Sequence, residues 1–295
     1  MKYPINMKGI VLAGGTGSRL FPLTSGLSKQ LLPVYDKPLI YYPIATLMLA
    51  GIRDIAIVTR ESDQLTFKSV LGDGKQFGVN FQYFTQKAPN GIAEVFMITE
   101  NFIKNEKVAL VLGDNIFHGV GLGRQLESLS NVNGARLFTH SVTNPKDFGI
   151  VEFDENQKVL SIVEKPEFPL SSFAATGLYF YDKDVSEVAK TVKRSPRGEL
   201  EITSVNNIYL EQGKLVATKL PRGTVWFDTG TFKSLFEATN YVKIVQESQS
   251  VQIACLEEIA WNNSWIDINL LTAAAERHHA NSYGHYLSNI ITSVK

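Results

Sequence analysis

Residues 8–20 read KGIVLAGGTGSRL, an apolar run that passes directly into closely spaced glycines. The run Lys8 to Ala13 is typical of a strand buried in a sheet. Glycines directly after such a strand let backbone N–H groups approach an anion, and Arg19 and Lys29 follow them with cationic groups that bind phosphate oxygens. The stretch predicts the first strand of an α/β fold followed by a phosphate-binding loop. A structural turn with solvated basic side chains is the alternative.

Two common phosphate motifs do not fit this loop. A dinucleotide fingerprint starting at Gly15 would need a glycine where Leu20 stands, and no Gly-Lys-Ser/Thr string completes a P-loop. A glycine loop alone favours the structural turn, so the phosphate-binding interpretation depends on what the rest of the chain supplies.

Strand-like and helix-like segments alternate through the first half of the chain. The predicted strands are residues 8–13, 54–59, 79–84 and 107–112, and the predicted helices are residues 42–50, 63–71 and 93–102. Strands that alternate with single helices predict βαβ units and a mostly parallel sheet. An open sheet of this kind binds ligands beyond the carboxyl ends of its strands.

The second half changes character. We expect strands at residues 135–142, 149–153, 159–163 and 174–181, a long helix at residues 231–245, and short helices after Ser250. No linker divides the chain, so residues 1–295 are predicted to form one domain. Its α/β core would span residues 7–248, and residues 249–295 would form a helical appendage at a subunit interface.

Composition narrows the class of protein. The chain has 29 basic and 29 acidic side chains, a balance that argues against a dedicated nucleic-acid binder. The single cysteine, Cys255, excludes an internal disulfide and is expected to be a buried apolar residue. The apolar stretch 39–50 falls short of the ~20 residues of a membrane span, and residues 1–6 lack the apolar region of a signal peptide. We expect a cytoplasmic protein that binds neither nucleic acid nor membrane.

Two acids follow hydrophobic segments. Asp114 comes directly after the predicted strand 107–112, and Asp228 lies in the string WFDTG at residues 226–230. Carboxylates at strand ends suit Mg²⁺, which takes one or two carboxylates together with substrate phosphates. A turn-forming Asp-Asn pair is the alternative for Asp114. With a phosphate loop, the two acids are the parts of metal-assisted phosphoryl or nucleotidyl transfer.

Two further strings carry cations. Glu164-Lys165-Pro166 ends the predicted hairpin, and Pro166 predicts an extended backbone at Lys165 that would hold its side chain at a strand edge. Residues 195–203, SPRGELEIT, lead from a loop into a helix, and Arg197 could hold a sugar phosphate there. A surface ion pair and helix-capping acids are the alternatives.

Taken in order along the chain, these strings resemble the sugar-1-phosphate nucleotidylyltransferases. Residues 14–22 and 28–38 are similar to the recognition pattern of that family. The resemblance is narrowed to the branch that makes dTDP-glucose by residues 113–115, 164–166, 177–182, 195–203, 228–231 and 254–260. It runs from Met7 to the C-terminus and implies a Rossmann-like, mixed and mostly parallel central sheet flanked by helices.

The resemblance implies an activity. An enzyme of this branch joins dTTP and α-D-glucose 1-phosphate with the help of Mg²⁺, giving dTDP-glucose and pyrophosphate. The sugar phosphate attacks the α-phosphorus in line, without a covalent enzyme intermediate. The reaction opens dTDP-deoxysugar biosynthesis and supplies polysaccharide biosynthesis. The resemblance also implies a homotetramer.

Site residues follow from the same resemblance. The nucleotide would contact Gly14, Gly15, Thr16, Gly17, Ser18, Arg19, Gln30, Gln86, Gly91 and Asp114. The sugar phosphate would contact Asn115, Gly149, Glu164, Lys165, Ala175, Tyr179 and Arg197. The catalytic cations would be Arg19, Lys29, Lys165 and Arg197, and the metal ligands Asp114 and Asp228.

One departure from the family pattern concerns the base pocket. Family members usually read PDGLAQ where residues 89–94 read PNGIAE, so Glu94 adds a negative charge there. The same chemistry on UTP or an amino sugar therefore stays open. A silent nucleotide-sugar sensor would be expected to have lost an acid or a cation, and this chain retains them all. A scaffold protein would explain the aromatic C-terminal part but none of the polar groups.

Overall fold

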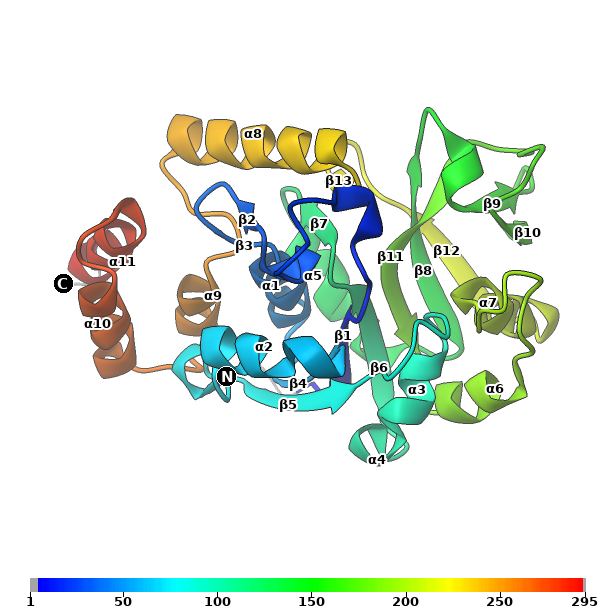
Figure 1. The fold of residues 1–295 in the computed structure, drawn as a ribbon, viewed down its shortest axis with the longest axis horizontal. Coiled ribbons are helices and arrows are strands. Elements are labelled where there is room, and N and C mark those ends of the chain that lie inside the picture. The colour runs from blue at the N-terminus through cyan, green and yellow to red at the C-terminus, as the bar shows by residue number, and fades with distance from the viewer. Residues whose placement is uncertain (1–4, 294–295) are drawn as a thin grey trace.

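A mixed nine-stranded sheet forms the centre of the protein, and the computed structural model describes residues 5–293 (Figure 1). Along the main path of the sheet the strands are β10 (Val159–Glu164), β9 (Gly149–Phe153), β11 (Phe173–Tyr181), β6 (Lys107–Leu112), β1 (Met7–Ala13), β4 (Asp54–Thr59) and β5 (Asn80–Thr85). Off this path, β8 (Ala135–Ser141) pairs with β11 and β12 (Leu215–Lys219). The predicted α/β class with a mixed, mostly parallel sheet is confirmed.

Four strands of the first half run parallel in the order β5-β4-β1-β6. Gly9 of β1 lies opposite Ile55 on one side and Ala109 on the other. Their carboxyl ends therefore meet at one edge of the sheet, where ligands bind in such folds. Strand β11 is antiparallel to β6 and carries the sheet into the second half.

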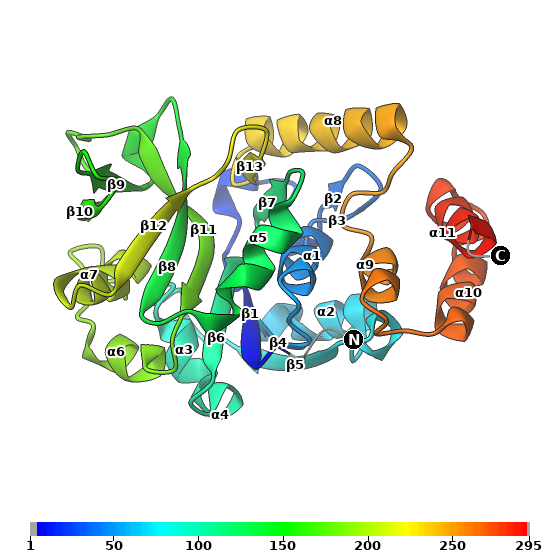
Figure 2. The ribbon, with the colours of Figure 1, turned by 180° about the vertical axis from the view of Figure 1, so that it is seen from behind.

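Alternating side chains of β1 enter two different apolar cores. Val11 belongs to a cluster with residues of α1 (Tyr41–Leu49), α2 (Gln64–Leu71) and α5 (Leu122–Glu127). Ile10 belongs to a cluster with residues of α3 (Glu94–Ile98), α4 (Glu100–Ile103), α6 (Val185–Thr191) and α7 (Ile202–Glu211). Seen from behind, α5 and α1 cross in front of the sheet (Figure 2). Burial on both faces explains why β1 and β6 read as continuous apolar runs.

Several elements differ from the sequence prediction. The helix expected at residues 93–102 is divided into α3 and α4, because Thr99 leaves helical geometry (φ −101°, ψ 12°). The prediction also lacked a set of very short strands: β2 (Pro33–Val34), β3 (Lys37–Pro38), β7 (Asn115–His118) and β13 (Val225–Asp228). Strands of two to four residues are too short to show a period in sequence.

Helix α8 (Phe232–Gln249) is the long helix predicted at residues 231–245. It begins with a capping box, in which the side chains of Thr231 and Ser234 each bond the other's backbone N–H. Its buried face, which includes Leu235 and Val242, packs on a third apolar cluster with Leu20. Helix α8 thus lies close to the loop that follows β1 (Figure 1).

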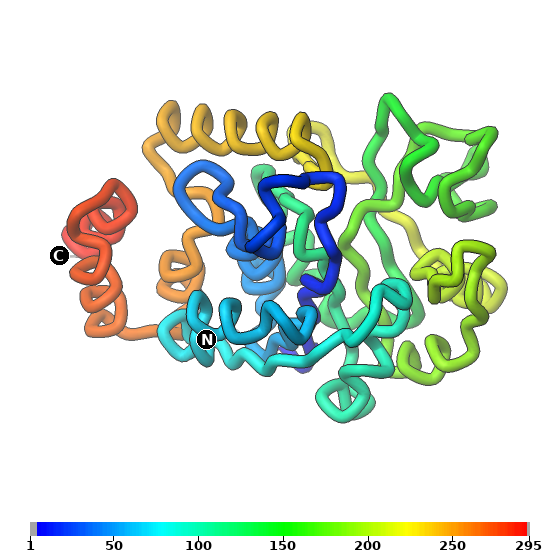
Figure 3. Tube along the Cα trace, viewed as in Figure 1, coloured from blue at the N-terminus to red at the C-terminus, as the bar shows by residue number. Residues whose placement is uncertain are grey.

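Three helices complete the chain, as expected after Ser250: α9 (Leu256–Asn262), α10 (Ile268–Arg277) and α11 (Ser282–Ser293). They lie at the end of the molecule away from β9 and β10 (Figure 3). Leu271 and Leu287 are fully buried in the same cluster as Val11. Among residues 5–293, no helix is long and apolar enough to cross a membrane. Of residues 1–6, for which no signal peptide is expected, Ile5 and Asn6 are described and the other four lie outside the described residues.

Candidate active site

The glycine loop lies at the carboxyl end of β1. Gly14 is buried against Gln86, and a Cβ on Gly14 would lie 2.6 Å from Gln86 Oε1. Gly17 has φ 65°, a conformation that favours glycine, and turns the chain into the short helical segment Ser18–Leu20. Gly15, Thr16 and Ser18 are exposed along the loop, where a ligand can reach them.

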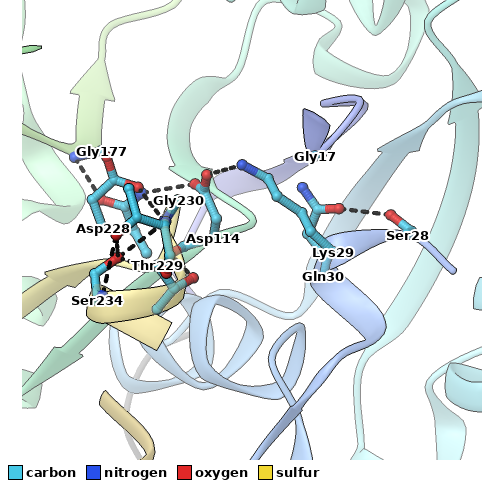
Figure 4. A network of polar contacts seen from close by, with 12 residues as sticks. Gly17, Ser28, Lys29, Gln30, Asp114, Gly177, Asp228, Thr229, Gly230 and Ser234 are labelled. Atoms are coloured by element: carbon cyan, nitrogen blue, oxygen red, sulfur yellow. Dashed lines mark hydrogen bonds and ion pairs between the residues drawn. The ribbon is translucent and has the colours of Figure 1, made fainter. Parts of the chain in front are cut away.

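Lys29 crosses from its own short helix to the glycine loop and the end of β6. Its Nζ lies 3.8 Å from the position of a Cβ on Gly15, and it forms an ion pair with Asp114 (Figure 4). Burial by itself would raise the pKa of Asp114, but the charge and hydrogen bond of Lys29 bring that pKa below its ordinary value. The predicted cation and the predicted acid are therefore in direct contact.

Asp228 lies beside Asp114 because β13 pairs with β7, which places Asp228 opposite Asn115. A further hydrogen bond connects the segments that carry Asp228 and Asp114: Thr229 N donates to the Asp114 carbonyl (3.0 Å). Burial, and then repulsion from Asp114, raise the pKa of Asp228 to about 6, while Lys29 and Arg19 act in the opposite direction. The carboxylates of Asp114 and Asp228 are therefore close enough to repel each other.

This pair fits a divalent cation. Asp114 and Asp228 offer oxygen ligands whose mutual repulsion a cation would relieve. Within residues 5–293, no group of three or more His, Cys, Asp or Glu side chains could hold a metal. Two protein carboxylates match the preference of Mg²⁺, which keeps several positions for water and substrate phosphate.

Asn115, for which a sugar contact stays a prediction, forms hydrogen bonds within the protein. Its Nδ2 donates to Asp114 Oδ1 (2.9 Å), and its Oδ1 accepts from Gly177 N (3.1 Å) and Trp226 Nε1 (2.6 Å). It is also buried at 2% exposure. Asn115 therefore orients a carboxylate from within the protein. A side chain at Gly177 would displace it, since a Cβ there would lie 2.6 Å from Asn115 Oδ1.

Three of the residues expected around the sugar converge. A Cβ on Gly149 would lie 3.1 Å from Glu164 Oε2 and 3.9 Å from the Cβ of Ala175. Glu164 accepts a hydrogen bond from Thr203 Oγ1 (2.6 Å) and pairs with Arg197 (3.3 Å). The arrangement joins the hairpin β9–β10, strand β11 and the start of α7.

The backbone conformation of Lys165 differs from the prediction. Its backbone is not extended, as Pro166 suggested, but left-handed with φ 45°. Its N–H still bonds the Phe148 carbonyl (3.0 Å), which extends the β9–β10 pairing by one residue and holds this sparsely populated conformation. The side chain is exposed and, within the described residues, makes no ion pair. It is free to meet an anionic ligand.

Tyr179 and Gln30, each expected to contact a ligand, are both buried in the protein. Tyr179 is 4% exposed, and its ring stacks on Tyr181 with centroids 6.3 Å apart. Burial, with the nearby charge of Glu164, raises the pKa of the Tyr179 hydroxyl. Gln30 is buried beside Gly113 and accepts from Ser28 Oγ (2.7 Å). A ligand contact by either remains a prediction.

The loop expected to hold the base is tied to the loop that carries Arg197. Leu200 N donates to the Asn90 carbonyl (2.7 Å), and Ala93 N donates to the Leu200 carbonyl (3.0 Å). Gly91 lies between these bonds with φ 110°, and a Cβ there would be 2.3 Å from the Leu200 carbonyl oxygen. Gln86 Nε2 donates to the Gly91 carbonyl (3.1 Å). The two halves of the candidate site are therefore one connected structure.

Some supporting residues were not found from sequence. Trp226 and Asn115 are 111 positions apart and meet only through the short pairing of β13 with β7. Thr203 and Glu201 lie in a string that had been singled out, but nothing in sequence indicated that Thr203 bonds Glu164 or that Glu201 pairs with Arg197 (2.9 Å).

Known proteins resemble the chain along nearly its whole length. The family described as nucleotidyl transferase matches residues 8–244. A glucose-1-phosphate thymidylyltransferase of Neisseria meningitidis is 52% identical over 286 residues, covering 97% of this chain and 99% of that protein. The enzyme of the same description from Mycolicibacterium smegmatis is 50% identical over 285 residues, covering 97% and 99%.

Solved structures agree with the fold. A Bacillus anthracis protein described as a glucose-1-phosphate thymidylyltransferase, in complex with sucrose, has a TM-score of 0.74 and 42% identity over 80% of this chain and 94% of that one. A UDP-glucose pyrophosphorylase in complex with UDP-glucose has a TM-score of 0.71 at 23% identity, covering 81% and 99%, which supports the fold alone.

Proposed function

This chain belongs to the nucleotidyl transferase family, and we propose that it joins dTTP to α-D-glucose 1-phosphate, releasing dTDP-glucose and pyrophosphate. The observation that supports the proposal most strongly is the meeting of the glycine loop, Lys29 and the pair Asp114 and Asp228 at one edge of the sheet. A triphosphate fits this edge because it needs backbone donors, cations and a metal together.

The chemistry is a single displacement. A phosphate oxygen of glucose 1-phosphate forms a bond to the α-phosphorus of dTTP, and the bond from that phosphorus to the bridging oxygen breaks. Pyrophosphate leaves with the electron pair. The nucleophile is already ionised at neutral pH, so positioning and charge neutralisation supply the catalysis.

The cations divide between the two reactants. Arg19 and Lys29 would neutralise the leaving pyrophosphate, because Lys29 lies over the glycine loop and Arg19 follows it. Lys165 and Arg197 would hold the sugar 1-phosphate, since they flank Glu164 on two neighbouring loops. Gly149, Glu164 and Ala175 would contact the glucose hydroxyls, and Gln86 and Gly91 the pyrimidine.

A magnesium ion would be held by Asp114 and Asp228. When bound there, it would neutralise charge on the α-phosphate as that phosphorus is attacked. Lys29, now paired with Asp114, would then be available to the phosphates. Titration of turnover with Mg²⁺ and removal of the metal by a chelator test this assignment: activity should disappear with the metal and return when it is restored.

The reaction is tested by identifying both products. With dTTP, glucose 1-phosphate and Mg²⁺, the protein should form dTDP-glucose and pyrophosphate in equal amounts, measured by chromatography and by coupled pyrophosphate detection. Neither should form when the sugar phosphate is omitted. Release of pyrophosphate or phosphate without sugar would indicate hydrolysis and contradict the proposal.

Arg197→Met tests the sugar-phosphate assignment. Loss of one bidentate donor should raise the KM for glucose 1-phosphate about tenfold or more and leave the KM for dTTP little changed. Arg124→Met, on the exposed side of α5, is the matched control and should behave like the unchanged protein. An equal effect of Arg197→Met on both substrates would contradict the assignment.

We also propose a cytoplasmic homotetramer whose subunits meet through the C-terminal helices. Exposed apolar side chains on two separate helices support an interface: Phe232 and Phe236 on α8, and Ile268 and Leu270 on α10. Light scattering coupled to size exclusion should give about four times the chain mass of 32.8 kDa. A monomer at micromolar concentration would contradict this part of the proposal.

A further inference from the structure

The carboxylate of Glu94 lies between the side-chain amides of Gln86 and Asn90, in the loop between β5 and α3 that is expected to hold the base. Glu94, in the first turn of α3, accepts from Asn90 Nδ2 on Oε1 (2.8 Å) and from Gln86 Nε2 on Oε2 (3.0 Å). On the far side, Arg194 Nη2 donates to Asn90 Oδ1 (3.2 Å). The four side chains form one continuous hydrogen-bonded chain from a guanidinium to Gln86.

Arg194 and Glu94 fix the donor and acceptor directions in this series of hydrogen bonds. A guanidinium only donates hydrogen bonds, and an ionised carboxylate only accepts them. Arg194 therefore turns the oxygen of Asn90 toward itself and the NH₂ group toward Glu94. Glu94 in turn can receive only the NH₂ end of Gln86.

The amide of Gln86 has no N–H left for a ligand. One is donated to Glu94 and the other to the Gly91 carbonyl (3.1 Å). The oxygen Oε1 lies on the opposite side, against Gly14 at the start of the glycine loop. Because Gln86 is buried at 6% exposure, an amide turned the other way would leave polar groups unmatched.

We propose that Glu94 is a specificity-determining positioning residue, which holds the amide of Gln86 so that only its oxygen faces the nucleobase. The proposal rests on the proposed function, in which Gln86 reads the pyrimidine. A fixed acceptor selects a base with a ring N–H at position 3, as thymine and uracil have. Cytosine carries an acceptor at that position and is rejected.

Removing the negative charge of Glu94 should reverse the direction of the hydrogen bond between residue 94 and Gln86. In Glu94→Gln, the oxygen of the new amide takes the NH₂ of Asn90, so its own NH₂ faces Gln86. Gln86 then meets a donor at residue 94, so its oxygen turns toward residue 94 and its NH₂ toward the base, at the loss of the bond to the Gly91 carbonyl. The ratio of kcat/KM for dTTP to kcat/KM for dCTP should fall about 10- to 100-fold.

A second substitution should restore the original polarity. Asn90→Asp, added to Glu94→Gln, places at position 90 a carboxylate that accepts from Arg194 and from the NH₂ group of residue 94. The oxygen of residue 94 then faces Gln86 again. The double variant should regain most of the original dTTP-to-dCTP ratio, which a merely structural role of Glu94 would not produce.

Two controls accompany the variants. Glu100→Gln removes the same charge from the exposed start of the neighbouring helix α4 and should leave the ratio unchanged. Thermal unfolding checks that each variant is folded. As a measurement that needs no variant, the unchanged protein should use N3-methyl-dTTP at least about tenfold less well than dTTP, because the methyl group replaces the ring N–H.

The outcomes separate this inference from the function on which it rests. An unchanged ratio in Glu94→Gln, no recovery in the double variant, or full turnover of N3-methyl-dTTP would each overturn the inference while the activity stands. An unchanged protein that releases no pyrophosphate with any pyrimidine triphosphate would refute the proposed function, and the inference with it.

Discussion

Asp114 and Asp228 are neighbouring half-buried carboxylates with opposite electrostatic surroundings. Asp114 is paired with Lys29 and bonded by Asn115, so its pKa is lowered. Asp228 accepts only a backbone bond from Gly230 (3.1 Å) among the described contacts and faces the charge of Asp114, so its pKa rises to about 6. The protein stabilises the charged form of Asp114 and disfavours the charged form of Asp228, and we expect a bound cation to relieve that penalty.

Asp228→Asn should abolish turnover without harming the fold. Losing one of two metal-holding carboxylates should lower kcat about 1,000-fold or more, since metal assistance contributes several kcal/mol. The melting temperature should stay the same or rise, because a repelled buried charge is removed. Pyrophosphate release and thermal unfolding measure the two effects, and turnover at the original rate would refute the two-carboxylate site.

Asp114→Asn should reduce activity equally but also destabilise the protein. Lys29, whose side chain is 11% exposed, would lose its partner, and the free energy of unfolding should fall by about 1–3 kcal/mol. Chemical denaturation of this variant beside Asp228→Asn measures the contrast. Equal stability of the two variants would contradict the account of Lys29.

At the scale of elements, the loop between β5 and α3 is joined to the segment before α7 through Leu200. Gly91→Ala would press a Cβ onto the Leu200 backbone at a residue with φ 110°. We expect a loss of about 1–3 kcal/mol in the free energy of unfolding and a higher KM for dTTP. Gly26→Ala, where nothing lies within 4 Å of the new Cβ, is the control. Equal behaviour of the two variants would contradict the connection between the loops.

Strand β7 and helix α8 meet where His118 Nδ1 and Tyr241 Oη form a hydrogen bond (2.8 Å). Burial lowers the pKa of His118 below its ordinary 6.5, so the unfolded chain takes up this proton first as the pH falls. Stability from this residue is therefore present above pH 6.5 and lost below it, by up to about 1.4 kcal/mol per pH unit.

The comparison of the unchanged protein with His118→Asn measures this effect. Between pH 7.5 and 5.5, the unfolding free energy of the unchanged protein should fall further than that of the variant. Other titrating groups are common to both and cancel. Parallel losses in the two proteins would show that His118 does not titrate on unfolding.

Elements with a long apolar run could be predicted from sequence, whereas contacts between short elements could not. Strands β1 and β6 are buried on both faces, so each has a continuous apolar sequence that predicts a buried strand. Strand β13 has only four residues, yet its pairing with β7 decides where Asp228 lies. The motif strings identified Asp114 and Asp228, but the backbone of Lys165 and the inward role of Asn115 depend on tertiary pairing.

At the scale of the whole molecule, the C-terminal helices share the core of the sheet. Leu271 is fully buried in the cluster that contains Val11, whereas the adjacent Leu270 is 43% exposed. Leu271→Ala should lower the free energy of unfolding by about 2–5 kcal/mol, and Leu270→Ala by less than about 1 kcal/mol. Chemical denaturation measures both. Equal small losses would mean that these helices are a detachable appendage.

We propose that this edge of the sheet transfers a thymidylyl group to glucose 1-phosphate. The most direct test is pyrophosphate release with glucose 1-phosphate and Mg²⁺, comparing dTTP with UTP, CTP, ATP and GTP. We expect rapid release with dTTP, much slower release with CTP and the purine nucleotides, and none without the sugar phosphate. Folded protein that binds dTDP-glucose but releases no pyrophosphate with any nucleotide would contradict it.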